Sequence, residues 1–320
     1  MTQPVVKNAP ESQIDSLRGE GKRIQVCDKE IRTRGKLVRV AFLDGEGYQF
    51  LDNLDVALES VRASDCGADL FTFVQKLSDR VPRYQYPMEW DNLAVLPVST
   101  FDHWMTHQID FRVRNKIRKA AKNGLVAREV PFDDVLVCGI QRVYNESPIR
   151  QGRRFWHYGE DVATVRRTKS SFLERSIFIG VFFEDQVIGF AKLVANEDWT
   201  QAGLMHILSM VRHRDKAPTN ALIAQAVRSC AERQIPHLWY ANFSYGRKQH
   251  DSLADFKRYN GFQRAEVPRY HVPLTTVGRL ALRMGLHHSI VDKIPEPIAA
   301  MYRKIRTFWY SKRFPASVGA

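Results

Sequence analysis

A run of basic residues lies between an apolar segment and a helical segment near the middle of the chain. Gly203 to Val211 is short and apolar, which predicts a buried strand. From Asn220 to Arg233 apolar residues recur at helical spacing, and Pro218 is typical of a first helical turn. A helix N-terminus presents backbone N–H groups and a positive dipole end, so this pattern predicts an anion-binding site, although a solvated basic turn is the alternative. The site residues expected are Leu208, Ser209, Met210, Val211, Arg214, Lys216, Ala217, Thr219, Asn220 and Ala221.

The same turn resembles a motif of the GNAT superfamily of N-acyltransferases. In that family the fourth strand is followed by Arg/Gln-x-x-Gly-x-Gly/Ala, whose amides hold the pyrophosphate of an acyl-coenzyme A. Here Arg214 matches the motif, whereas Ala217 and Thr219 stand at the glycine positions. A left-handed conformation at Ala217 would cost on the order of 1 to 2 kcal/mol. The resemblance implies acetyl-CoA or another acyl-CoA as cosubstrate, and the missing glycines imply either a different loop path or a different donor.

A second part of the resemblance lies near residue 260. GNAT chains commonly close their last helix with a tyrosine followed four residues later by Gly-Phe, and the tyrosine often protonates the departing thiolate. Here Gly261 and Phe262 match, but Lys257 takes the tyrosine position. The pair Phe256-Lys257 is instead similar to the Fem-type aminoacyltransferases, which build peptidoglycan cross-bridges from aminoacyl-tRNA and have two GNAT-like halves. The resemblance implies that Lys257 is catalytic and stabilises a departing tRNA oxygen or thiolate, with an exposed helical lysine as the alternative.

A long segment between two predicted helices combines arginines with aromatic residues. Leaving Phe155 and Trp156 in water would be costly, so we expect this segment to be ordered. In GNAT proteins the acceptor binds here, so the resemblance implies an acidic or phosphorylated acceptor. His157 is a candidate general base, and a hydrogen-bonding surface histidine is the alternative. The acceptor-binding residues expected are Arg150, Arg153, Arg154 and Tyr158.

The elements that must position these residues follow the GNAT order. Residues 125 to 275 read as β-α-α-β-β-β-α-β-α-β-β, with a hairpin around Glu184 to Gln186 and two short final strands around Pro268. The fold class expected is α/β (α+β), a GNAT-like mixed sheet flanked by helices after a smaller, degenerate GNAT-like half. The units expected are a flexible N-terminus (1–22), a small α/β unit (23–99), a connecting helix (100–124), the GNAT-like domain (125–275) and amphipathic C-terminal helices (276–320).

The connecting helix expected from Thr100 to Asn123 has a second half that carries six cations and no acid. A one-sign block of this kind is a candidate docking surface for phosphate, and a nonspecific solubilising face is the alternative. The six cations are Arg112, Arg114, Lys116, Arg118, Lys119 and Lys122.

The whole chain is basic, with 48 Lys and Arg against 35 Asp and Glu and a net charge of +13. Such an excess favours anionic partners, among them tRNA, acidic lipid headgroups and phosphorylated small molecules. The four cysteines lie far apart, the N-terminus lacks the apolar core of a signal peptide, and no apolar run approaches about 18 residues, so we expect a soluble cytoplasmic protein. His287 and His288 lack a carboxylate or cysteine at ligand spacing, so no metal is expected.

Beyond Thr275, apolar residues alternate with cations at helical spacing. This pattern is typical of a helix lying on an anionic inner membrane surface, and packing on the domain is the alternative. A membrane-proximal site would suit a lipid-linked acceptor. The sequence therefore leaves three functions: an N-acyltransferase that uses acyl-CoA, a Fem-like aminoacyl-tRNA-dependent transferase acting on a cell-envelope precursor, or a noncatalytic module that binds RNA or membrane.

Overall fold

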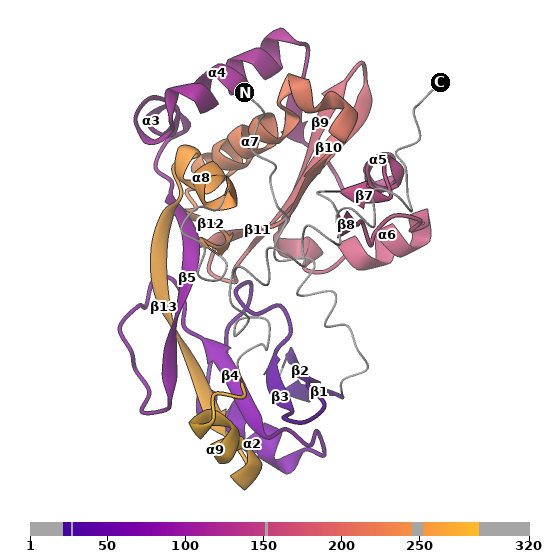
Figure 1. Cartoon of the computed structure of the whole chain (residues 1–320). Coiled ribbons are helices and arrows are strands. Elements are labelled where there is room, and N and C mark those ends of the chain that lie inside the picture. The colour runs from indigo at the N-terminus through magenta and orange to yellow at the C-terminus, as the bar shows by residue number, and fades with distance from the viewer. Residues whose placement is uncertain (1–21, 27, 151–152, 245–251, 288–320) are drawn as a thin grey trace.

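The computed structural model describes residues 22–26, 28–150, 153–244 and 252–287. One eleven-stranded mixed sheet runs through it in the order β1-β2-β3-β4-β13-β5-β12-β11-β10-β9-β6, and β7 and β8 form a separate two-stranded sheet (Figure 1). The strands are β1 (Arg23–Val26), β2 (Lys29–Arg34), β3 (Val40–Leu43), β4 (Leu70–Val74), β5 (Met88–Pro97), β6 (Val126–Glu129), β7 (Ile149–Arg150), β8 (Arg153–Arg154), β9 (Ser176–Phe183), β10 (Gln186–Ala195), β11 (Ala202–Ser209), β12 (His237–Asn242) and β13 (Gln263–Pro273).

Helices cover both sides of the strands in the C-terminal half (residues 88–275). Figure 1 shows α7 on one side of β9 to β11 and α5 with α6 on the other. Apolar side chains of α5 and α7 that recur at helical spacing pack here into the largest core cluster. The helices are α2 (Leu54–Ala63), α3 (Phe101–His103), the π-helical η1 (Trp104–Gln108), α4 (Phe111–Lys122), α5 (Asp134–Asn145), α6 (Val162–Lys169), the 3-10 segments η2 (Leu173–Arg175) and η3 (Val211–Lys216), α7 (Pro218–Glu232), α8 (Ser252–Tyr259) and α9 (Thr276–Arg283).

Two long strands, β5 and β13, connect the C-terminal half with the N-terminal half (residues 22–87). β5 pairs with β12, and β13 pairs with both β4 and β5. Each half contains three antiparallel strands, a helix, and a strand parallel to the third: β1-β2-β3-α2-β4 in one half and β9-β10-β11-α7-β12 in the other. The two expected units therefore share one sheet.

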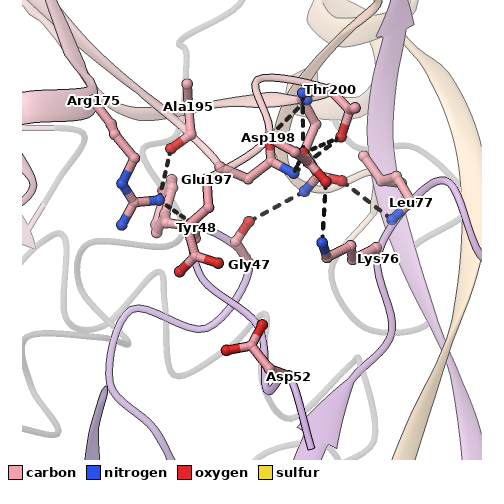
Figure 2. A network of polar contacts seen from close by, with 12 residues as sticks. Gly47, Tyr48, Asp52, Lys76, Leu77, Arg175, Ala195, Glu197, Asp198 and Thr200 are labelled. Carbon is pink, nitrogen blue, oxygen red and sulfur yellow. Dashed lines mark hydrogen bonds and ion pairs between the residues drawn. The ribbon is translucent and has the colours of Figure 1, made fainter. Parts of the chain in front are cut away.

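Polar contacts join the halves around the turn between β10 and β11 (Figure 2). The Arg175 guanidinium donates hydrogen bonds to the carbonyls of Tyr48 (2.9 Å) and Ala195 (3.0 Å). Lys76 Nζ lies 3.1 Å from Asp198 Oδ2. The turn is thus held from both sides by the N-terminal half. Further bonds run from Leu77 N to Gln201 Oε1 (3.2 Å), from Gln201 Nε2 to Gly47 O (3.2 Å) and from Lys29 Nζ to Glu197 Oε1 (3.5 Å).

The predicted GNAT order is confirmed from β6 to α8. The predicted hairpin is also confirmed, and its two central residues, Glu184 and Asp185, both have positive φ values (48° and 59°), as a type I′ turn requires. α7 begins and ends within two residues of the expected positions. These segments combine a clear apolar period with unambiguous turn residues.

Two expectations about elements were wrong, and two strands were missed. The helix expected from Thr100 to Asn123 breaks at Ile109, because Asp110 caps a new helix while its amide binds the Tyr259 carbonyl (3.0 Å). The two final strands are one strand, because Pro268 lies just beyond the end of β4 and its missing N–H removes no bond of that ladder. The polar strands β1 and β2 were not expected at all.

No helix among the described residues is long and apolar enough to cross a membrane. The apolar and basic repeat expected to contact an anionic membrane, from Ile298 onward, lies outside the described residues, as do residues 1–21.

Candidate functional site

The two central parallel strands of the C-terminal half separate along their length. β11 pairs with β12 only at Ala202 with Leu238 and Gly203 with Trp239, although both strands continue beyond these positions. β12 is also irregular there, since Ala241 has a positive φ of 49° and its pairing with β5 shifts register. Parallel strands that diverge leave backbone groups available to a ligand between their carboxyl ends. The predicted site residues lie around this divergence.

The basic turn connects the end of β11 to the head of α7. Ala217 has φ 61° and ψ 45°, the left-handed conformation in which alanine is strained by about 1 to 2 kcal/mol. Ala217 therefore has the backbone conformation expected of the motif glycine. Of the two explanations for the missing glycine, a different loop path is excluded and a different donor is left. α7 begins at Pro218 without a side-chain cap. Ser209 and Thr219 are linked across the turn by a hydroxyl contact of 3.1 Å.

The basic face of α4 lies next to this turn. α4 packs against α7 and η3. Partial burial and the positive charges of Arg112 and Arg214 lower the pKa of Lys116, so these three cations are close enough to repel one another. The structure therefore brings together two features that were separate in the sequence. One is α4, whose charged side chains are all basic, and the other is the anion-binding turn. Arg118, Lys119 and Lys122 are exposed further along α4.

The first amides of the turn are already occupied by a carboxylate of the chain. Glu146 accepts hydrogen bonds from the amides of Val211 (2.6 Å) and Arg212 (2.9 Å). The predicted amide of Met210 donates to the Ile188 carbonyl (2.8 Å). The turn thus binds an anion in this structure, and that anion is internal. An incoming phosphate or oxyanion at Val211 would have to displace the Glu146 carboxylate.

The predicted acceptor residue Arg150 is turned toward the interior. Its guanidinium donates to the carbonyls of Ser209 (2.8 Å) and Val143 (2.6 Å) and pairs with Glu146 (3.1 Å). Only 9% of its side chain is exposed, and burial lowers its pKa although the Glu146 charge opposes the change. Arg150 therefore ties Glu146 and the end of β11 together, whereas the predicted role was contact with the acceptor.

Lys257 reaches the diverging end of β12. It lies in α8 and is fully buried (0% exposed), so the alternative of an exposed helical lysine is wrong. Its ammonium donates to the carbonyl of Asn242, the last residue of β12, at 2.5 Å. It also lies 4.6 Å from the centre of the Tyr240 ring. A buried ammonium fixed at this point is suited to stabilise negative charge that develops between the strands.

The remaining acceptor-loop residues divide into a buried and an exposed group. His157 is 1% exposed, and its Nδ1 lies 2.8 Å from Glu160 Oε1, so the alternative of a surface histidine is wrong. An ionised Glu160 carboxylate can only accept, so Nδ1 donates in that pair and the orientation of the ring is fixed. The imidazole ring stacks on the Tyr144 ring, with 4.4 Å between the two ring centres. Arg153, Arg154 and Tyr158 are exposed.

A buried cluster of two lysines and a histidine was not predicted. Lys192 of β10 is the register partner of His206 of β11, and His206 Nε2 lies 3.3 Å from Lys169 Nζ at the end of α6. All three side chains are at least nine-tenths buried. The signal in the sequence was a charged or polar residue inside an otherwise apolar strand, at Lys192 and at His206.

The cluster combines groups whose protonation is shifted in the same direction. Burial and the charge of Lys169 lower the pKa of Lys192 to about 7, although its ammonium donates to the Lys169 carbonyl (2.9 Å) and the Ser171 carbonyl (2.5 Å). Burial lowers the pKa of His206 to about 4, so this ring is neutral near pH 7 and accepts from Lys169. Lys192, whose pKa is near neutral, is therefore the member of the cluster that can accept a proton, whereas the neutral His206 ring orients the Lys169 ammonium.

No protein family model matches the chain, and no curated protein matches it either. Solved structures do match. FemX superposes with a TM-score of 0.57 at 10% identity, covering 85% of this chain and 92% of FemX. The C-terminal domain (DUF2156) of a protein assigned as a lysylphosphatidylglycerol synthetase from Agrobacterium fabrum gives 0.56 at 13% identity, with 87% and 91% covered.

A third structure, L-PGS from Bacillus licheniformis, superposes with a TM-score of 0.52 at 13% identity, covering 84% of this chain and 94% of that one. Each match extends over both halves of the sheet, since it covers more than four-fifths of the chain. At these identities the likeness concerns the fold. The chain therefore has a GNAT-like fold of the Fem type, as the sequence resemblance predicted.

Proposed function

We propose that this protein is a Fem-like transferase that moves an aminoacyl group from aminoacyl-tRNA to an amine of an anionic acceptor. The observation that carries the proposal is Lys257, an ammonium with 0% exposure at the diverging end of β12, in the position where the acyl-CoA enzymes have a tyrosine. A lysine that stays charged stabilises a departing oxygen without transferring its own proton.

The proposed reaction is a displacement at the ester carbonyl. The acceptor amine attacks this carbonyl carbon, a C–N bond forms, and the C–O bond to the 3′ ribose of the tRNA breaks. The amine loses one proton, and the ribose oxygen gains one. The role of Lys257 is to stabilise that oxygen as negative charge develops on it. His157, which is held by Glu160, and Lys192 of the buried cluster are the candidate proton acceptors.

The charge around the site supports a polyanionic donor. The cations of α4 continue beyond the turn along a helix that carries no acid, which exceeds what one pyrophosphate needs. A tRNA acceptor stem presents a row of phosphates that such a helix matches. On the other side of the site, the exposed Arg153 and Arg154 are proposed to contact an acidic or phosphorylated acceptor, including a lipid-linked one.

A second candidate, an acyl-CoA-dependent N-acyltransferase, is favoured by one observation. Ala217 keeps the left-handed conformation of the glycine in the pyrophosphate motif, despite the strain. A strained turn at the head of an uncapped helix is suited to a pyrophosphate. This candidate therefore differs from the first in the donor and not in the site.

Donor binding separates the candidates. Binding of aminoacylated tRNA, of the same tRNA without its amino acid, and of acetyl-CoA is measured at low and at moderate salt, with adenosine diphosphate as the control for acetyl-CoA. The control matters because a chain of net charge +13 attracts any anion at low salt. We expect the aminoacylated tRNA to bind more tightly than the uncharged tRNA at moderate salt, and acetyl-CoA to bind no better than the control.

Saturable acetyl-CoA binding that persists at moderate salt, with no discrimination between the two tRNAs, would replace the first candidate by the second. If neither donor shows a saturable site and all binding disappears with salt, the protein is a basic binding module and both candidates fail.

A further inference from the structure

A cluster of two histidines and a glutamate lies outside the candidate site, and its Glu89 is four residues along β5 from Leu93, the register partner of Asn242. Glu89 is in β5, His271 is in β13, and His287 ends the turn that follows α9. One ligand atom from each residue lies within 4.8 Å of the others. The three residues come from three separate segments, so spacing along the chain gave no sign of the cluster. The sequence-based expectation of no metal considered only the neighbours of His287.

The distances within the cluster are close to those of a metal site. His287 Nε2 lies 2.9 Å from one oxygen of Glu89, and His271 Nε2 lies 3.7 Å from the other. Ligands placed about 2.0 to 2.2 Å from a tetrahedral Zn²⁺ are about 3.4 Å from one another. The ligand atoms lie within 4.8 Å of one another, so side-chain rotations that bring the most distant pair closer by up to about 1.4 Å would place them at ligand positions.

The environment of His271 indicates that a partner belongs there. Its side chain is more than nine-tenths buried, and neither ring nitrogen has a hydrogen-bond partner among the described residues. The 3.7 Å separation from Glu89 is too long for a hydrogen bond. A buried polar atom without a partner destabilises the folded state, so its retention calls for an explanation. A metal ion between the three residues would supply it.

The turn that carries His287 is held in place from both ends of α9. Gly278 lies so close to β4 that a Cβ there would be 2.0 Å from the Asp69 carbonyl, and the side chain of Thr275 binds Asp69 (2.9 Å). After the helix, Gly285 has a positive φ of 63° and the Leu286 amide bonds the Ala281 carbonyl (2.8 Å). His287 is therefore presented to β5 and β13 by a fixed turn, as a metal ligand requires.

We propose that Glu89, His271 and His287 bind one divalent transition-metal ion, with Zn²⁺ preferred. Two imidazole nitrogens and a carboxylate oxygen favour Zn²⁺ over Mg²⁺ or Ca²⁺, which prefer all-oxygen sites. A water molecule would complete four-coordination. The ion fastens the turn after α9 to the two strands that join the halves, so its role is structural and independent of the transferase site.

The test measures metal binding to the full chain without an affinity tag. Protein stripped with a chelator is titrated with Zn²⁺, and Co²⁺ serves as a second probe because its visible absorption reports tetrahedral coordination. We expect one Zn²⁺ per chain, a higher thermal midpoint on binding, and no rise of the midpoint with Mg²⁺. His271→Ala, His287→Ala and Glu89→Gln should each weaken Zn²⁺ binding at least 100-fold.

The matched control is His103→Ala, which removes an exposed histidine of α3 and should leave Zn²⁺ binding unchanged. Glu89→Gln keeps the size of a side chain that is 40% exposed, so it tests the site even if His271→Ala does not fold. Wild-type protein that binds Zn²⁺ no more tightly than Glu89→Gln would overturn the proposal, and so would equal binding by all variants. Transferase activity does not enter either result.

Discussion

The two halves of the sheet contain the same arrangement of a strand, a helix and a parallel strand. The two parallel strands separate from each other in only one of the halves. β3 and β4 remain paired at Val40 to Phe42, whereas β11 and β12 separate after their second pair. The heads of the two helices differ as well. The side chain of Asn53 caps α2 and Asp55 lies in its first turn, so that helix satisfies its own positive end.

The head of α7 is built in the opposite way. It has no side-chain cap, begins after a strained Ala217, and faces the cations of the turn and of α4. The comparison shows that a strand-helix-strand unit alone does not make an anion site. The strands must separate, and the helix N-terminus must not be satisfied by its own side chains. The matching order of elements supports our proposal that the N-terminal half is a reduced copy of the C-terminal half.

The largest expected effect concerns the diverging strands. Lys257→Met keeps the volume of the side chain and removes its charge, so transition-state stabilisation is lost and kcat/KM should fall about 100- to 1000-fold. The matched control is Lys29→Met, which removes a buried lysine of the N-terminal half (4% exposed) and should leave kcat/KM unchanged. Wild-type turnover by a folded Lys257→Met protein would remove this lysine from the mechanism.

The second expected effect concerns the head of α7. Replacing Arg214 and Lys216 together by alanine should weaken donor binding at least tenfold, because two cations beside the donor phosphates are lost. Replacing Lys36 and Arg62, two exposed cations of the N-terminal half, removes the same charge and should change the affinity little. If both double variants lose the same donor affinity, then only the net charge of the protein attracts the donor.

A third prediction concerns the strained residue. Ala217→Gly relieves about 1 to 2 kcal/mol of left-handed strain but adds about 0.5 to 1 kcal/mol of unfolded-chain entropy. The free energy of unfolding, measured with urea, should therefore rise by about 0.5 to 1 kcal/mol. The control variant Ala221→Gly, within α7, should instead lower the free energy of unfolding by about 1 kcal/mol. Destabilisation by Ala217→Gly would show that the alanine side chain is needed for packing.

The smallest effect concerns the join between the halves. Although burial opposes it, hydrogen bonds from Thr200 and Lys76 lower the pKa of Asp198 from 3.8 to about 2. A lowered folded-state pKa gives stability that is complete above pH 4 and is lost as the pH falls toward 2. Asp198→Asn should remove this part of the acid dependence, measured as unfolding free energy against pH. If the unfolding free energy of the wild type and of Asp198→Asn falls with the same slope between pH 4 and 2, then Asp198 does not contribute to the acid dependence.

Much of the fold could be predicted because its central elements are locally determined. β9 to β11, α7 and the hairpin turn have clear apolar periods and turn residues. What failed depended on distant contacts. The break at Asp110 needs the end of α8, and the continuity of β13 through Pro268 depends on where β4 ends. β1 is only four residues long and β2 has a single apolar residue, Ile31, so neither gave a strand pattern of useful length.

The candidate site was only partly visible from the sequence for the same reason. Lys257 and the head of α7 could be found from motifs, and the one-sign helix from its charge. The carboxylate of Glu146 on the amides of the turn and the inward orientation of Arg150 arise from contacts between segments 59 to 66 residues apart. The buried cluster of Lys169, Lys192 and His206 likewise exists only after β10 and β11 pair in register.

Hydrogen–deuterium exchange with a non-hydrolysable aminoacyl-tRNA analogue tests the central claim most directly, because it reads both helix heads in one experiment. Our account predicts slower exchange on binding in residues 203–223 and along α4, with no change in residues 53–63, which include the N-terminus of α2. Protection at the head of α2, or binding without protection at the head of α7, would contradict it.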